Sequence, residues 1–256
     1  MKVIAGERVE EIVGGNNNNN NNSSSRNGQA KTVKTSSNRE INADFIIVGI
    51  GIRPNSEIAR DAGIELRYAN AIKVDDYMRT NMPGVFAAGD CATARNYITD
   101  KDTYLPLGTT ANKQRRVAGE NAADGNAKFR GIAGSAITKV FGLFMGKTGL
   151  TREEALKYGF DDTVEEEIES ITRAGYYPGS KPIWIKIIAY RKSKRVLSSQ
   201  IVGGEGVKER IDLISLALLL KADIADLAAY DSCYVLPASA VWEPVNIAAS
   251  QLAKKL

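Results

Sequence analysis

The amino-acid sequence predicts an α/β region with buried strands, followed from about residue 150 by an α+β unit with an antiparallel sheet. The first observation is a pair of apolar runs, residues 43–48 and 85–88, each closed by a glycine. Such runs are typical of strands buried on both faces of a parallel sheet. The second observation is a change of pattern in residues 151–256, where alternating segments and amphipathic helices replace these runs.

The composition excludes several classes of function. The chain has 256 residues, of which 43% are hydrophobic and 25% charged, as in ordinary globular proteins, and its net charge of +4 is too small to indicate a dedicated nucleic-acid binder. It contains no histidine, which excludes a Ser-His-Asp triad, a Cys-His pair and any imidazole-ligated metal. Its two cysteines, Cys91 and Cys233, form no CxxC motif, so we expect no disulfide framework and no metal site.

The sequence shows no sign of export or membrane insertion. The first fifteen residues lack the apolar core of a signal peptide, because charges interrupt them by position 7. The longest apolar helix candidate, residues 211–220, is far shorter than the roughly 18 apolar residues that a membrane span needs. We therefore expect a cytoplasmic protein with no membrane partner.

The first forty residues predict an antiparallel ribbon, with short strands at 3–5, 8–12 and 31–35. Seven asparagines occupy positions 16–22 within the loop of this ribbon. Such a run is either a self-associating polar tract or a flexible, even engineered, connector, and we favour the connector.

The middle of the chain predicts short elements around two turns. A helix is expected at 57–62 after the N-cap candidate Ser56, a strand at 71–74, a turn at 82–84, and the buried strand 85–88 that ends at Gly89-Asp90. A longer helix opens near 108–110 and runs to about residue 124.

The C-terminal part has clear helix starts and one hairpin. A capping box at Thr151–Glu154 begins a helix that Gly159 closes, and a strand lies within 163–174. Strands 183–190 and 195–202 form a hairpin, an amphipathic helix covers 207–221, and Asp223 caps a final short helix.

Gly89-Asp90 is the first candidate for chemistry. A carboxylate at the carboxyl end of a buried strand lies where ligands of open α/β sheets bind, and it can accept hydrogen bonds from hydroxyl groups. Strand ends use the same two residues routinely, so the pair alone leaves a purely structural role open.

Several ordered motifs together resemble the FAD-dependent pyridine nucleotide–disulfide oxidoreductases, and within them the coenzyme A-disulfide reductase and NADH oxidase branch. The motifs cover nearly the whole chain apart from the asparagine loop. They are residues 47–55 (IVGIGIRPN), 78–90 (MRTNMPGVFAAGD), 107–114 (LGTTANKQ), 139–141 (KVF), 148–151 (TGLT), 175–178 (GYYP) and 241–244 (VWEP).

The resemblance implies the fold, the cofactors and the site residues. The fold would be FAD/NAD-binding (Rossmann-like) remnants followed by an α+β dimerisation domain with antiparallel sheet. The cofactors would be FAD and NAD(P)H. Asp90, with Gly89 beside it, matches the residue that binds the FAD ribitol, and Ile50-Gly51 matches the region near the nicotinamide. The segment against the isoalloxazine ring corresponds to Leu107, Gly108 and Thr109, and a helix N-terminus that starts near Thr110 would favour the negative charge of a reduced flavin.

Tyr234 is the candidate catalytic residue. The coenzyme A-disulfide branch has a tyrosine ahead of a proline pair, whereas Tyr234-Val235-Leu236-Pro237 keeps the tyrosine and only one proline. Tyr234 would donate a hydrogen bond to a thiolate or disulfide of the partner subunit, or it is a packed interface tyrosine, and the sequence leaves both alternatives open.

Three hallmarks of the family are absent from the sequence. Neither GxGxxG fingerprint nor the redox-cysteine motif occurs, and we interpret Cys91 and Cys233 as structural. The chain therefore resembles the C-terminal half of such an enzyme. We expect the remainder of an NAD(P)H-binding domain at 1–55, a segment of an FAD-binding domain at 56–150, and a dimerisation domain at 151–256.

Two main functions follow. In the first, the chain is part of a flavin-dependent NAD(P)H oxidoreductase that passes hydride to FAD and then to a disulfide or oxygen. This enzyme would act as a homodimer through residues 151–256, and the chain alone would be inactive. The second is a non-catalytic dimerisation scaffold that cannot bind FAD by itself. Nucleic-acid binding through the basic turn 191–195 is disfavoured, because no aromatic residue interleaves its charges. The sequence identifies neither the electron acceptor nor a preference for NADH or NADPH.

Overall fold

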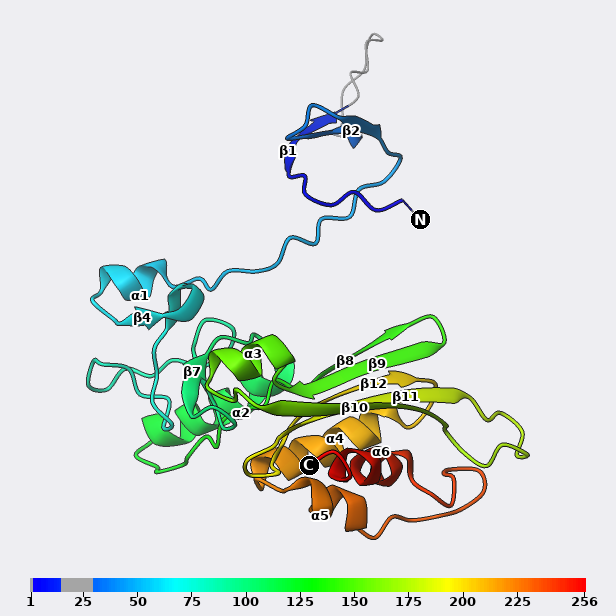
Figure 1. Ribbon diagram of the computed structural model, residues 1–256. Helices are drawn as coiled ribbons and strands as arrows, with labels where there is room; N and C mark the ends of the chain where they lie inside the picture. The colour runs from blue at the N-terminus through cyan, green and yellow to red at the C-terminus, as the bar shows by residue number, and fades with distance from the viewer. Residues whose placement is uncertain (1, 15–29) are drawn as a thin grey trace. The chain divides into compact units, whose positions relative to one another are not determined.

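The structure is a computed structural model that describes residues 2–14 and 30–256 (Figure 1). The asparagine run at 16–22 lies outside the described residues. The chain forms two compact units, Met1–Ile52 and Arg53–Leu256.

The first unit contains a three-stranded antiparallel sheet in the order β1-β2-β3, and its strands are Val9–Gly14, Ala30–Thr35 and Glu40–Asn42. The predicted ribbon is confirmed for its strands near 8–12 and 31–35, which pair with Ile12 opposite Val33. The predicted strand at 3–5 is wrong, because these residues have no regular secondary structure.

The two apolar runs predicted as buried parallel strands are not strands. Residues 43–48 make no backbone hydrogen bond with any residue that the structure describes, and Phe45 and Ile47 are 79% and 82% exposed. Within 85–88, Phe86 forms an isolated antiparallel bridge to Arg79, and the N–H of Ala87 donates to the carbonyl of Met78 at 3.1 Å. A parallel strand needs a neighbour that runs in the same direction, and the described part of the chain provides no such strand beside either run.

The first part of the second unit holds short elements and one long helix. They are α1 (Glu57–Asp61), β4 (Leu66–Arg67), a 3-10 turn (Tyr68–Asn70), β5 (Ala71–Ile72), β6 (Ala94–Asn96), β7 (Lys101–Thr103) and α2 (Gly108–Ala122). The predicted helices near 57–62 and 108–124 are confirmed, and the strand predicted at 71–74 is shorter. Ser56 does precede α1, but its hydroxyl donates to the carbonyl of Asn70 rather than capping the helix.

A small core holds this part together. Its buried side chains come from the residues around β5 and β6 and from the segment after α2, and they are Ile72, Val74, Met78, Ala92, Ala94 and Phe129. At about 1.5–3 kcal/mol for each large buried side chain, this cluster stabilises the short elements that carry the Gly89-Asp90 turn.

A five-stranded antiparallel sheet dominates the rest of the second unit, in the order β10-β11-β12-β9-β8 (Figure 1). Its strands are β8 (Ala136–Val140), β9 (Leu143–Gly149), β10 (Thr163–Ile171), β11 (Pro182–Tyr190) and β12 (Val196–Gly203). The predicted hairpin is confirmed as β11–β12, and the sheet also includes β8 and β9, which precede residue 150.

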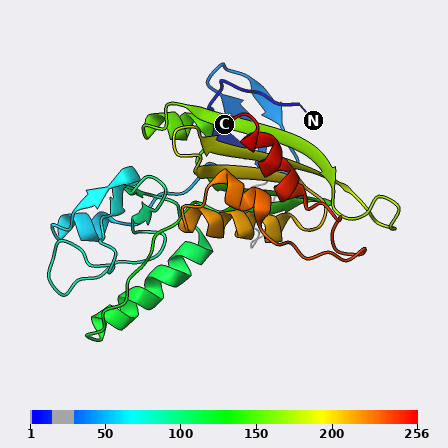
Figure 2. The same ribbon diagram turned by 60° about the horizontal axis from the view of Figure 1, so that its bottom comes forward.

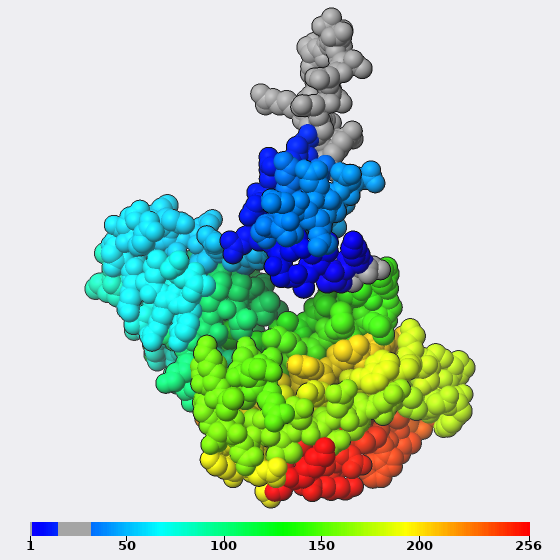
Figure 3. Space-filling view, turned by 45° about the horizontal axis from the view of Figure 1, so that its top comes forward, coloured from blue at the N-terminus to red at the C-terminus, as the bar shows by residue number. Residues whose placement is uncertain are grey.

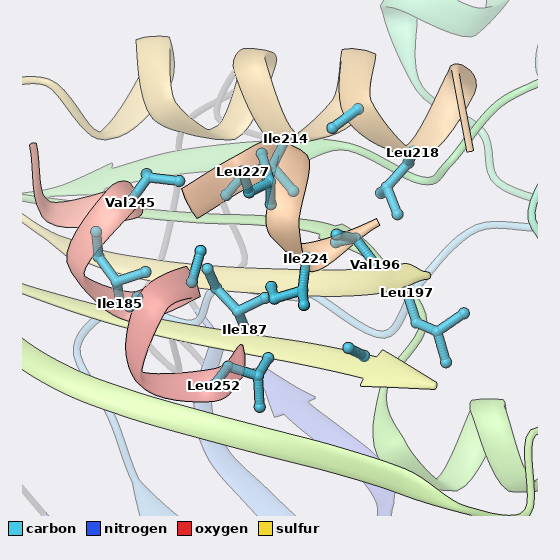
Figure 4. Packing of buried hydrophobic residues seen from close by; sticks show 14 of the residues in the cluster. Ile185, Ile187, Val196, Leu197, Ile214, Leu218, Ile224, Leu227, Val245 and Leu252 are labelled. Carbon is cyan, nitrogen blue, oxygen red and sulfur yellow. The ribbon is translucent and has the colours of Figure 1, made fainter. Parts of the chain in front are cut away.

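Helices α4 (Val207–Leu219), α5 (Ile224–Ala229) and α6 (Pro244–Ala253) cover one face of this sheet, seen in orange to red in Figure 2. Ile183, Ile185 and Ile187 alternate along β11 and are fully buried under these helices. Figure 4 shows Ile185 and Ile187 directed toward Ile214, Ile224, Leu227 and Leu252, which lie on the helices. The period of two along β11 therefore determines which face of the sheet forms the main core.

Both predicted helix starts in this region are confirmed. Helix α3 (Arg152–Lys157) begins with a capping box in which Thr151 and Glu154 exchange hydrogen bonds of 2.8 and 3.2 Å. Asp223 caps α5 in the same way.

The prediction that α5 is the last helix is wrong. Helix α6 follows, with Glu243 as its N-cap and Pro244 in its first turn, where a proline costs no hydrogen bond. Figure 3 shows the red C-terminal residues, which include α6, at the surface. Beyond α6, Lys255 pairs with Glu166 on β10.

Candidate functional site

The Gly89-Asp90 turn is closed by its own backbone and needs its glycine. The N–H of Ala92 donates to the carbonyl of Gly89 at 3.0 Å, and Gly89 has a φ of +91°, a conformation that side chains disfavour. A Cβ built on Gly89 would lie 3.9 Å from the Cβ of Ala111, so the turn runs close to α2.

Two side chains fasten this turn to the region of α2. Gln114, on α2, accepts a hydrogen bond from the N–H of Gly89 at 3.0 Å and donates to the carbonyl of Thr93 at 2.8 Å. The hydroxyl of Tyr104 donates to the carbonyl of Asp90 at 2.9 Å. The structure thus brings Gly89 and Asp90 together with the beginning of α2.

The first backbone N–H groups of α2 have no acceptor in the part of the chain that the structure describes. Leu107 occupies the N-cap position with an extended backbone and makes no side-chain capping bond. The first backbone N–H to find an acceptor is that of Ala111, which donates to the carbonyl of Leu107 at 2.9 Å. Gly108 and Thr109 are exposed, whereas Thr110 is buried. Together with the helix dipole, these donors favour an anionic or carbonyl ligand.

The Asp90 carboxylate is exposed and makes no hydrogen bond or ion pair with the residues that the structure describes. Its main chain is anchored, while its side chain is free to accept hydrogen bonds from a ligand. Partial burial raises the pKa of Tyr104, and the charges of Asp90 and Cys91 raise it further, so its hydroxyl keeps the proton that it donates.

The remaining candidates belong to other parts of the chain. Ile50 and Gly51 belong to the first unit, where Ile50 is 92% exposed and Gly51 has a φ of +89°. No hydrogen bond among the described residues joins Tyr234 to the Asp90 turn. Partial burial raises the pKa of Tyr234, and the neighbouring Tyr176, which is exposed, adds to the rise.

The two cysteines are both free. Cys91 is partly buried in the turn, with its Sγ 3.5 Å from the carbonyl oxygen of Ala88, and Cys233 is exposed. Within the described ranges, no group of three Asp, Glu, Cys or His side chains is arranged to hold a metal ion.

Sequence reasoning missed Gln114 and Tyr104. Gln114 stood in the motif 107–114 without a role, but it follows Thr110 by four positions on the same helical face. A glutamine on the buried face of a helix must satisfy its amide, so this position was the available signal. Tyr104 carries no comparable signal, because the contact depends on the fold of residues 90–104.

A cavity of about 570 Å³ lies elsewhere in the second unit and is lined mostly by charged residues between Glu65 and Asp102. Several of these charges already pair, as Lys73 does with Glu65 at 2.9 Å and Arg95 with Asp76 at 3.4 Å. Its lining includes none of the candidate site residues. In the described ranges, no helix combines the length and the apolar character that crossing a bilayer requires.

Comparison with known protein families gives two matches. Residues 1–116 match the model described as pyridine nucleotide-disulphide oxidoreductase, and residues 135–243 match the model of the dimerisation domain of the same family.

Named relatives agree with these matches. The chain is 40% identical to an NADH oxidase of Methanocaldococcus jannaschii over 215 residues, which are 84% of this chain and 47% of the relative. It is 29% identical to a coenzyme A disulfide reductase of Staphylococcus aureus over 222 residues, which are 86% of this chain and 50% of the relative. The chain thus spans about half the length of the curated relatives that it matches.

The fold is also similar to solved structures. An NAD-dependent persulfide reductase from A. fulgidus superposes with a TM-score of 0.86 and 35% identity, over 97% of this chain and 44% of the other.

Proposed function

This chain belongs to the pyridine nucleotide-disulphide oxidoreductases, and from that premise we propose that it is part of an FAD-dependent NAD(P)H oxidoreductase. The fold class expected from the sequence and the resemblance to this family are confirmed. The observation that carries the proposal is the meeting of the Gly89-Asp90 turn with the uncapped start of α2.

The residues at this meeting point suit FAD. Asp90 would accept hydrogen bonds from the ribitol hydroxyls, and Gly89 would let the backbone approach the cofactor. The backbone of Leu107, Gly108, Thr109 and Thr110 would lie against the isoalloxazine ring and offer N–H groups to its carbonyl edge. Bound FAD would supply the transfer of a hydride equivalent from the nicotinamide to the acceptor.

NAD(P)H would bind with its nicotinamide near Ile50 and Gly51. The positive φ of Gly51 supports a role in which the backbone passes close to a ligand, since only glycine adopts this conformation without strain.

The acceptor would be a disulfide or oxygen. These two classes are consistent with relatives and neighbours named NADH oxidase, coenzyme A disulfide reductase and persulfide reductase. Tyr234 would donate a hydrogen bond to a thiolate of the acceptor, and its raised pKa supports a hydroxyl that remains protonated. A packing role at an interface is the alternative for this residue.

The protein would act as a homodimer through residues 151–256, which extend across most of the match to the dimerisation domain. In the same proposal, residues 1–55 belong to the NAD(P)H-binding domain and residues 56–150 to the FAD-binding domain. None of the relatives and structures named above is described as a scaffold, so the non-catalytic alternative gains no support.

The test is FAD binding by wild-type protein that also contains the part by which the curated relatives are longer than this chain. Replacing Asp90→Ala should weaken FAD binding by about tenfold or more, because hydrogen bonds to a charged acceptor are lost. Flavin absorbance and the quenching of flavin fluorescence measure this affinity.

The matched control is Asp61→Ala, which removes the same charge from an exposed position on α1. This control should bind FAD as the wild type does. An Asp90→Ala protein with undiminished affinity would overturn the assignment of this residue.

A further inference from the structure

Gln114 is a polar side chain with no access to solvent, at 0% exposure on α2. Its amide bridges the two ends of the Asp90 turn: Oε1 accepts from the N–H of Gly89 at 3.0 Å, and Nε2 donates to the carbonyl of Thr93 at 2.8 Å. Both functions of the amide are thus used at once. A buried amide costs free energy unless it is satisfied, so the turn and Gln114 constrain each other.

A second side chain fixes the point between these two ends. The Tyr104 hydroxyl donates to the carbonyl of Asp90 at 2.9 Å. The backbone of residues 89–93 is therefore anchored at three successive places by side chains from outside the turn.

The Asp90 carboxylate contributes nothing to this anchoring, because it makes no hydrogen bond or ion pair with the described residues. The direction of this carboxylate is therefore set by the backbone of residues 89–93 alone. The same anchoring sets the spacing between Asp90 and the free N–H groups of Gly108 and Thr109, because Gln114 belongs to the helix that presents those groups.

We propose that Gln114, assisted by Tyr104, is a positioning residue for FAD: it holds the Asp90 carboxylate and the start of α2 in the relative geometry that the cofactor requires. The inference rests on the proposed function. It adds that the affinity for FAD depends on a buried amide that does not touch the cofactor.

Asn121 provides a matched control on the same helix. It is also buried, and its amide donates to the carbonyls of Tyr77 and Ala127 at 2.9 Å each and accepts from the N–H of Ala127 at 2.7 Å. Gln114→Met and Asn121→Leu each keep the size of the side chain and remove its amide. Both leave backbone groups unpaired, but only the first affects the Asp90 turn.

The first measurement is the dissociation constant for FAD, by flavin fluorescence, in the protein of full length. Gln114→Met should raise it by about tenfold or more, and Asn121→Leu by less than about twofold, since only the former releases the turn. Tyr104→Phe, which removes a single partly exposed hydroxyl, should raise it by about threefold and serves as the second variant.

The second measurement needs no flavin. Cys91 lies within the anchored turn, and Cys233 is exposed and distant in sequence. Gln114→Met should speed the alkylation of Cys91 by iodoacetamide by about tenfold relative to Cys233, because opening of the turn then costs fewer hydrogen bonds. Asn121→Leu should leave that ratio unchanged.

The outcomes separate the two claims. A wild-type protein that takes up no FAD overturns the proposed function and the role of Gln114 toward FAD with it. Wild-type protein that binds FAD, with Gln114→Met and Asn121→Leu equally affected, overturns only the positioning role. Equal alkylation of Cys91 in all proteins shows that Gln114 does not order the turn, which also overturns the inference.

Discussion

Arg210 and Glu243 form an ion pair that is almost completely buried, with side chains 8% and 9% exposed. Two hydrogen bonds of 2.5 and 2.9 Å join the guanidinium to the carboxylate. Arg210 also donates to the carbonyl of Gly206 at 3.0 Å, and Glu243 accepts from the N–H of Val245 at the start of α6. The pair therefore ties α4 to α6, and each charge depends on the other for its solvation.

Removing one partner should be costly. We expect Arg210→Met to lower the free energy of unfolding by about 3–5 kcal/mol, because it leaves the Glu243 carboxylate buried without a counter-ion. Urea denaturation followed by circular dichroism measures the change. The control is Lys208→Met on the same helix, which breaks an exposed pair with Asp212 and should cost less than about 1 kcal/mol. A similar loss in both variants would contradict the role of burial.

Because two tyrosines are buried, we expect the folded state to lose stability at alkaline pH. Burial raises the pKa of Tyr97 above the ordinary value of 10.0, although its hydrogen bond to Ser215 opposes part of the rise. Burial also raises the pKa of Tyr230, and the charge of Glu243 adds to that rise. The folded state thus holds protons that the unfolded chain releases, so this stabilisation is complete below pH 10 and is lost as the pH rises through the folded pKa values.

Tyr97→Phe tests this linkage. The variant should be less stable than the wild type near pH 8, because the hydroxyl donates to the carbonyl of Ser215 at 3.2 Å. Its stability should then fall less steeply above pH 10, by about one bound proton in the slope. Urea denaturation at several pH values gives both quantities. Parallel slopes for the two proteins would show that Tyr97 is not one of the linked groups.

At the scale of elements, residues 43–52 are apolar and yet extended and exposed. The side chains of Phe45, Ile47 and Ile50 are largely exposed to solvent, and this segment makes no backbone hydrogen bond within the described ranges. Exposed apolar surface of this extent favours association with other apolar groups.

Polar substitutions in this segment should therefore hardly change the free energy of unfolding. We expect Ile47→Ser with Ile50→Ser to shift the free energy of unfolding by less than about 0.5 kcal/mol for each residue, and to reduce binding of the hydrophobic dye ANS. Ile187→Ser, at a fully buried position of β11, is the contrasting variant and should be strongly destabilising. A large loss of stability in the Ile47 and Ile50 variant would mean that these side chains are packed.

These elements also show what the sequence can predict. The capping box of Thr151 and the cap of Asp223 could be predicted from the sequence, because a cap is a contact between residues two or three positions apart. The hairpin β11–β12 could be predicted from the alternation of apolar and polar residues along its strands and from the turn between them. The runs 43–48 and 85–88 have the composition of buried strands, but a strand exists only with a neighbour, and composition says nothing about whether that neighbour is at hand.

The candidate site, too, could be predicted only in part from the sequence. Asp90 and the start of α2 stood in recognisable motifs, whereas the contacts of Gln114 with Gly89 and Thr93 join residues more than twenty positions apart. A buried amide reveals its partners only in the folded chain.

At the scale of the whole molecule, the second unit presents exposed aromatic and aliphatic side chains from three segments separated in sequence, residues 175–178, 234–237 and 241–244. They are Tyr176, Tyr234, Val235, Val241 and Trp242. Tyr176 lies near enough to Tyr234 to raise its pKa, so residues 175–178 and 234–237 are close together, which neither motif could reveal. Large exposed apolar groups in a dimerisation domain are consistent with a subunit interface.

The proposed homodimer can be weakened at this surface. Trp242, which is 73% exposed, should shift the protein toward monomer when replaced by aspartate, with at least about a tenfold rise in the dimer dissociation constant. Sedimentation velocity measures the distribution. Ile58→Asp, at an exposed apolar position on α1, is the control and should leave the dimer intact. Equal sedimentation of Trp242→Asp and wild type would place the interface elsewhere.

The two buried amides of α2 give that helix a fixed length between them. Gln114 and Asn121 are seven positions apart, close to two helical turns, so both face inward and each reaches its own loop. One inserted residue between them would rotate one amide by about 100° away from its loop. The surface of α2 can therefore vary in sequence, while the number of residues along this stretch cannot.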